Sequence, residues 1–185
     1  MTRFKKSGGQ VLITLADYEE AVLESLVEQL IELLEGDGVQ DAGGDSFAQW
    51  EAEMAAPGGM DTSDPVIARL FPPAYRDDPA ADAEFRRFTE AAQRRTRIEQ
   101  AELVLDALRE TNAGRDPAIM RTIDADAWLK TISALRLSLA VRLGIEDPAD
   151  IEALEQLGEH EPQAVLYGMY EWIGYFLEGL LGKLP

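Results

Sequence analysis

The stretch from Trp128 to Gly144 constrains the fold most, because it is apolar over most of the circumference of a helix. One face of that helix carries large apolar residues three or four positions apart, namely Trp128, Ile132, Leu135, Leu139 and Leu143. Leu137 and Val141 add apolar side chains on another side. Such a helix is buried at the centre of a protein rather than laid on its surface. We therefore expect a mainly α fold, a single helical domain of about five to six helices around a central buried helix at 124–143.

Two arginines interrupt this helix, and Arg136 projects from within its apolar arc. A guanidinium there must reach water or meet carboxylates, because a buried unpaired charge is costly. The segment 84–90 offers carboxylates beside two phenylalanines that we expect to point inward. We therefore predict that Glu84 or Glu90 pairs with Arg136 or Arg142. The resulting ion-pair cluster, or alternatively anion site, would comprise Glu84, Arg86, Arg87, Glu90, Arg136 and Arg142.

Helix starts are encoded repeatedly as an acidic residue followed by proline. This order supplies an acceptor at the N-cap and proline at the first helical position, after Asp64, Asp78, Asp147 and Glu161. The predicted helices are a short one at 65–71, a long one from Pro79, and two more at 148–157 and 162–182. Asp17 followed by Glu20 predicts a further capped helix that Gly36 ends. On that helix we expect a solvated glutamate row of Glu20, Glu24, Glu28 and Glu35.

The long helix from Pro79 has two apolar stripes on nearly opposite sides. One stripe holds Phe85, Phe88 and Ala92, and the other holds Ile98, Ala101, Leu105 and Leu108. We expect the helix to bend between them or to pack against different elements along its two halves. The only concentrated basic patch lies there and consists of Arg94, Arg95 and Arg97. We interpret the patch as a solvated face paired with nearby glutamates, and keep an anion or nucleic-acid site as the alternative.

The N-terminal residues 3–15 predict a β-hairpin, since Gly8 and Gly9 can supply the positive φ of a tight turn. A lone hairpin is marginally stable, so a third short strand could join it, with 121–123 as the candidate. Residues 36–63 are rich in Gly, Asp and Ala, and predict a mobile acidic insertion with a short helix near 46–55. The whole chain, 1–185, is expected to be one domain.

The net charge is −18 and is unevenly distributed. From Asp17 to Asp64 there are fourteen acidic residues and no basic one, and after Gly144 nine acidic residues face Lys183 alone. Such a charge opposes non-specific attraction to nucleic acid and to anionic membranes. It favours another protein as the partner, and a basic one in particular. The wide apolar face of 162–182 also allows a homodimer contact.

Several classes of chemistry are missing from the sequence. It has no cysteine, which excludes disulfides, thiolate zinc sites and thiol-based redox sensing in this chain. The single histidine, His160, is expected to be a loop residue rather than a metal ligand. No common nucleotide-binding, hydrolase or metalloprotease motif occurs, so we expect no cofactor and no metal, and catalysis is disfavoured. Neither a targeting signal nor a membrane span is evident, which predicts a cytoplasmic protein.

An ordered set of short motifs covers almost the whole chain. The motifs are Asp64-Pro65, Arg69-Leu70, Pro72, Ala74-Tyr75, Asp77-Asp78, Glu84-Phe85-Arg86-Arg87, Thr89-Glu90, Trp128-Leu129, Leu135-Arg136-Leu137, Arg142-Leu143-Gly144 and Tyr170-Glu171-Trp172-Ile173-Gly174. Together they resemble an actinobacterial family catalogued as a domain of unknown function (number twenty-seventeen). The resemblance implies a small soluble protein of unassigned biochemistry, often encoded beside the adaptor of the Clp protease, and some members carry a transcriptional-regulator label. This chain has Ser133-Ala134 and Ala140-Val141 where members often have Asn-Asp and Gly-Thr.

Three functions are therefore compatible with the sequence. The favoured one is a non-enzymatic protein-interaction or regulatory module. The first alternative is a transcription-associated regulator that uses the region Arg86–Arg97, because a recognition helix needs cationic and base-reading side chains. The second is an enzyme or small-anion binder in which Arg136 and Arg142 act with carboxylates.

Overall fold

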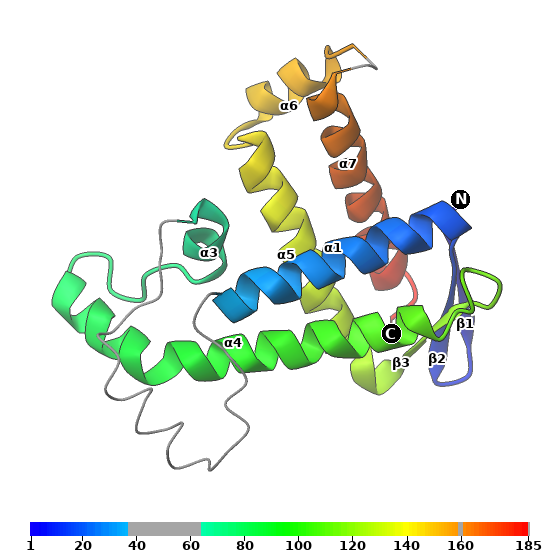
Figure 1. Ribbon diagram of the computed structural model, residues 1–185, viewed down its shortest axis with the longest axis horizontal. Coiled ribbons are helices and arrows are strands. Elements are labelled where there is room, and N and C mark those ends of the chain that lie inside the picture. The colour runs from blue at the N-terminus through cyan, green and yellow to red at the C-terminus, as the bar shows by residue number, and fades with distance from the viewer. Residues whose placement is uncertain (37–63, 159–160, 185) are drawn as a thin grey trace.

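The mainly α fold is confirmed by a computed structural model that describes residues 1–36, 64–158 and 161–184 (Figure 1). In chain order the elements are β1 (Arg3–Ser7), β2 (Gln10–Thr14), α1 (Asp17–Glu35), α3 (Pro65–Leu70), α4 (Pro79–Arg109), β3 (Ala118–Arg121), the 3₁₀ turn η2 (Thr122–Asp124), α5 (Ala125–Leu143), α6 (Pro148–Glu155) and α7 (Pro162–Leu181). The insertion predicted at 36–63 and its short helix near 46–55 lie, apart from Gly36, outside the described residues. No helix within the described ranges is long and apolar enough to cross a membrane.

Helix α5 is the centre of the fold, as its apolar circumference predicts. It lies between the α1–α4 pair and α7 (Figure 1), and it also contacts α3. Its predicted core stripe is buried at four of five positions, Trp128, Ile132, Leu135 and Leu139, and Leu143 is half-buried. The Trp128 indole stacks on the Phe176 ring of α7, with the ring centroids 6.4 Å apart. The helix thus buries its apolar residues fully or in part, and its exposed positions include Lys130, Arg136 and Arg142.

The small sheet has the order β1-β2-β3, and both strand pairs are antiparallel. The predicted hairpin is confirmed. The third strand exists, but it lies at 118–121 rather than at 121–123. Alternation explains the shift, because Ala118 and Met120 are buried beneath the sheet whereas Ile119 and Arg121 face outward. Thr122 then leaves the strand, and its backbone N–H donates to the Gly9 carbonyl oxygen at 2.9 Å.

The hairpin packs on α7 through a notch at Gly179. A Cβ atom built at Gly179 would lie 2.2 Å from Cε2 of Phe4, so the ring of Phe4 occupies the space that a larger residue would need. The same ring makes an edge-to-face contact with Phe176 at 5.1 Å. Thr2, which directly precedes β1, accepts a hydrogen bond on its hydroxyl from the Trp172 indole N–H at 3.0 Å. The first and last elements of the fold are therefore joined directly.

Three of the four predicted acid–proline caps are confirmed by hydrogen bonds from the side chains of Asp64, Asp78 and Asp147 to the first turns of their helices. At the fourth, Glu161 is the N-cap and Pro162 follows it as predicted, but the Glu161 carboxylate accepts from the Gly158 backbone N–H at 3.1 Å rather than from the first turn of the helix. The cap of α1 lies one residue earlier than expected. Ala16 is the capping position, and its backbone N–H donates to Glu19 at 2.8 Å.

The expected solvated glutamate row on α1 is also wrong in part. Glu20 is buried and accepts a hydrogen bond from the Thr111 hydroxyl at 2.9 Å. Glu24 and Glu28 both pair with Arg109 at the end of α4, at 3.1 and 2.7 Å. The row faces α4 because the two helices lie side by side (Figure 1). Carboxylates that looked solvated thus connect α1 to α4.

The turn after α4 uses an unusual backbone. Asn112, Ala113 and Gly114 all have positive φ, at 55°, 55° and 73°. Only glycine adopts this region without steric cost. Gly114 is also required for space, since a Cβ there would lie 3.2 Å from the Cα of Asp17.

Candidate functional site

The N-terminal half of α4 turns its charged side toward the protein. Glu90 and Arg94 are buried, and Arg86 is largely covered. Glu90 lies between the two arginines, with 3.8 Å from its Oε2 to Arg86 Nη1 and 3.9 Å from its Oε1 to Arg94 Nε. Both separations exceed hydrogen-bond length, so the three groups attract one another electrostatically. We call Arg86, Glu90, Arg94 and Arg97 the inner arginine cluster.

Helix ends explain why arginines occupy this inward side. Arg94 Nη1 donates to the Leu34 carbonyl oxygen at 2.6 Å, in the last turn of α1. Arg86 Nη2 donates to the Phe71 carbonyl oxygen at 2.8 Å, and Arg97 Nη2 donates to that of Leu70 at 3.3 Å, both at the end of α3. The last carbonyls of a helix lack intrahelical partners and carry partial negative charge. Cationic donors on α4 therefore fix the ends of both helices.

Phe71 supports the same arrangement. The guanidinium groups of Arg94 and Arg97 lie 5.5 and 5.2 Å from its ring centroid, within the range of a cation–π contact. Burial lowers the pKa of both guanidinium groups, and the nearby carboxylate of Glu90 opposes that change at Arg94. The predicted basic patch is therefore not one solvated face. Arg94 is buried and Arg97 is half-buried, while Arg95 is exposed.

The two phenylalanines of this segment do not point inward, which corrects the prediction. The exposed fractions are 38% for Phe85 and 57% for Phe88. Their side of the helix is opposite the inner arginine cluster, and the helix ends of α1 and α3 attract the charged side. Tyr75 meets the edge of Phe85 with ring centroids 5.9 Å apart, and the Arg87 guanidinium lies 4.9 Å from the Phe88 ring centroid. An aromatic surface with a flanking arginine results.

Arg136 finds an aromatic partner rather than a carboxylate. Its guanidinium lies 4.7 Å from the ring centroid of Tyr170 on α7, and Nη2 donates to the Tyr170 hydroxyl at 3.0 Å. The predicted pairing of Arg136 or Arg142 with Glu84 or Glu90 is not formed. Helix α5 turns Arg136 toward α7, and Glu90 is already engaged by arginines of its own helix.

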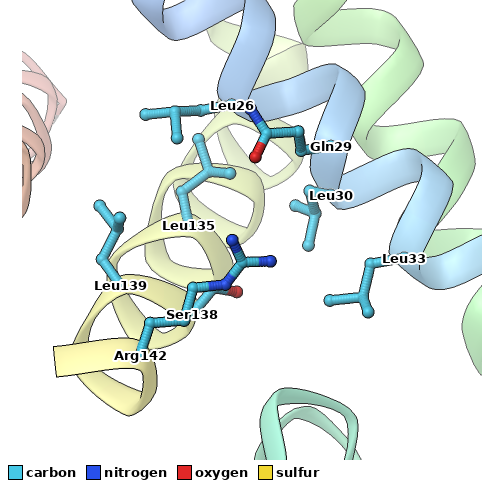
Figure 2. A pocket seen from close by; sticks show the side chains of 8 residues that line it. All are labelled: Leu26, Gln29, Leu30, Leu33, Leu135, Ser138, Leu139 and Arg142. Atoms are coloured by element: carbon cyan, nitrogen blue, oxygen red, sulfur yellow. The ribbon is translucent and has the colours of Figure 1, made fainter. Parts of the chain in front are cut away.

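Arg142 lies on a different side of α5, in an open groove against α1 (Figure 2). Among the described residues Arg142 forms no ion pair, and it is exposed. In Figure 2 its guanidinium reaches across the groove toward α1. Gln29 and Ser138 add polar groups, and the apolar lining consists of Leu26, Leu30, Leu33, Leu135 and Leu139. We call this the α1–α5 groove. A single cation above a floor of leucines is suited to an apolar ligand that carries one negative charge.

The six predicted cluster residues thus divide among four environments. Arg86 and Glu90 join the inner cluster, Arg136 joins Tyr170, and Arg142 joins the groove. Glu84 and Arg87 face solvent on the outer side of α4. Sequence reasoning missed the groove, since its leucines on α1 read as ordinary core positions. Within the described part of the chain, no group of three or more His, Asp or Glu side chains is placed to hold a metal ion.

Comparison with known proteins agrees with the motif resemblance. The chain is similar to the oxidative stress regulator AosR of Mycobacterium tuberculosis and to that of Mycobacterium bovis. In both cases the identity is 28% over 190 residues, which cover 95% of this chain and 83% of the relative. No solved structure matches the chain. A family model described as a domain of unknown function (DUF2017) matches residues 1–184, and the chain therefore belongs to that family.

Proposed function

We propose that this chain is a non-enzymatic regulatory protein that acts by binding another protein in the α1–α5 groove. The observation that carries the proposal is Arg142, which has no ion-pair partner among the described residues and lies over a leucine floor. Arginine is enriched at protein–protein interfaces and among their hot spots. The name of the mycobacterial relatives supports a regulatory role.

The groove suits one kind of occupant. An amphipathic helix can place apolar side chains on Leu26 and Leu33, which are half-buried, as helix-in-groove complexes do. A carboxylate on the same face would pair with Arg142 in a charge-assisted contact. Because the chain carries a net charge of −18, a partner that is basic elsewhere would associate faster. Oxidation of a thiol in this chain is excluded as the regulatory signal, since it has no cysteine.

The test compares partners captured from a lysate of the native organism. Arg142→Glu reverses the charge in the groove, and Arg115→Glu makes the same change on an exposed loop residue as the matched control. A protein recovered with the wild type and Arg115→Glu, but lost with Arg142→Glu, supports the groove. A photo-crosslinking residue in place of Gln29 should then join that same protein covalently. Equal recovery by both variants would rule out the groove, and recovery of no protein at all would contradict the proposed function.

The two alternative functions find less support in the geometry. A transcription-associated regulator would use Arg86–Arg97, but Arg86, Arg94 and Arg97 are bound to carbonyl oxygens inside the protein. An anion binder would use Arg136 and Arg142 together, but these face α7 and α1 respectively. DNA binding at low salt would revive the first alternative, and saturable binding of inorganic phosphate would revive the second.

A further inference from the structure

The outer side of α4 carries an apolar stripe that no described element covers at its centre. The stripe consists of Ala81, Phe85, Phe88 and Ala92, and the exposed fractions of the phenylalanines are 38% and 57%. This end of α4 extends beyond α1 (Figure 1). Scattered exposed apolar residues are normal, but two adjacent exposed phenylalanines on one helical face mark a contact surface. We call these four residues the outer stripe.

The outer stripe is symmetric about its centre in both residue spacing and residue size. Its spacing is four, three and four residues, and its order is small, large, large, small. If two copies of α4 lie antiparallel with a two-fold axis between positions 86 and 87, Phe85 faces Phe88 of the partner subunit. Ala81 then faces Ala92 of the partner subunit. A two-fold contact requires a surface that is complementary to itself, and the outer stripe meets that condition.

The charged residues beside the stripe are also complementary to themselves across a two-fold axis. Glu84 and Arg87 lie on one flank, and neither forms an ion pair with another described residue. With a rise of about 1.5 Å per residue, the antiparallel arrangement brings Glu84 within roughly 3 Å, measured along the helix axis, of the partner's Arg87. The two-fold axis creates this pair twice. Opposite charges on the same flank therefore fix both the direction and the register of the contact.

We propose that the outer stripe is a self-association site at which a second copy of this chain binds through an antiparallel α4–α4 contact. Four stripe residues and Tyr75 per copy bury less than the roughly 1,200 Å² of a stable interface. The association is therefore weak and depends on protein concentration. This contact uses α4, in contrast to the homodimer that the sequence suggested through 162–182, and it leaves the α1–α5 groove free.

Sedimentation velocity over a wide range of protein concentration tests the proposal. The wild type should shift from monomer to dimer as the concentration rises, whereas Phe85→Ser/Phe88→Ser should stay monomeric. The matched control is Val165→Ser/Leu181→Ser, which removes two exposed apolar side chains from α7 and should dimerise like the wild type. A wild type that stays monomeric up to millimolar concentration would overturn the proposal. Loss of the dimer only in the α7 variant would do the same.

A charge exchange gives a second and more specific test. Glu84→Arg alone and Arg87→Glu alone each place like charges across the proposed contact, so each should dimerise at least several-fold more weakly than the wild type. An equimolar mixture should recover association, because every charge in the mixed dimer again faces its opposite. Since both positions are exposed, circular dichroism should show unchanged folding. Failure of the mixture to recover would refute the antiparallel register.

Discussion

Replacing each of three glycines of α7 by alanine should change the free energy of unfolding differently, raising it at one position and lowering it at another. Replacing glycine by alanine inside a helix contributes about 1 kcal/mol to stability through helix propensity alone. A Cβ at Gly168 meets no atom within 4 Å, so Gly168→Ala should gain that amount. At Gly179 the Cβ would lie 2.2, 2.5 and 2.7 Å from three carbons of the Phe4 ring. That ring would have to move, and α7 would lose its contact with the hairpin.

At Gly179 the steric cost of adding a Cβ exceeds the gain in helix propensity from alanine. Phe4 cannot rotate away freely, because Phe176 and Tyr175 contact its ring at centroid distances of 5.1 and 6.4 Å. Overpacking of this kind costs about 1–3 kcal/mol. After the gain in propensity, Gly179→Ala should be destabilising by about 1–2 kcal/mol. Gly174→Ala should fall between the other two, since its Cβ would meet only the flexible Arg136 side chain at 3.3 Å.

Urea unfolding followed by circular dichroism measures the three free energies of unfolding. The clearest control is Phe4→Ala, which empties the notch. In that background Gly179→Ala should become stabilising by about 1 kcal/mol, since only the propensity difference remains. If Gly179→Ala in the otherwise wild-type protein proves as stable as Gly168→Ala, the packing of Phe4 in the notch is not what requires glycine, and the reasoning fails.

Three further predictions concern other parts of the molecule. Ala113→Gly should raise the free energy of unfolding by about 1 kcal/mol in thermal denaturation, because Ala113 has φ 55°. Arg94→Met should lower the free energy of unfolding by about 3 kcal/mol, because it removes one partner of a buried ionic cluster. Arg136→Met should lower it by less than about 1 kcal/mol, because Arg136 is exposed. Equal losses for the two variants would contradict the assigned burial. Backbone N–H groups of Glu146 and Asp147 lower the pKa of Asp150, so its stabilising effect exists at neutral pH and disappears as the pH falls through that lowered pKa. Asp150→Asn should therefore flatten the loss of stability below about pH 4 in an acid titration.

Features with a local cause could be predicted from the sequence. Asp64, Asp78 and Asp147 cap their helices through hydrogen bonds to residues no more than three positions away, so the local sequence is enough to predict these caps. The central helix was predictable as well, because a helix that contacts several others is apolar over most of its circumference. The third strand was predicted to begin three residues too late, because Ile123 has a high strand propensity although it is 84% exposed.

Features with a distant cause could not be predicted. Which side of α4 faces the protein depends on carbonyl oxygens at the ends of α1 and α3, and these lie up to 60 residues away in sequence. Hydrophobic periodicity alone assigns Phe85 and Phe88 to the core, because it contains no information about where other helices end. The sequence singled out Arg142 as a charge on an apolar helix, but the surroundings of Arg142 depend on how α1 crosses α5 (Figure 2).

The contact between the hairpin and α7 has a consequence for biosynthesis. Trp172, which binds Thr2, is 170 positions further along the chain, and Gly179 lies beyond it. At a typical translation speed of about 5–20 residues per second, the hairpin leaves the ribosome roughly 10–30 s before its docking site exists. Throughout that interval the ring of Phe4 and the inner face of the sheet have no partner on α7. Nascent chains that stall before α7 should therefore be the form of this protein most dependent on chaperones.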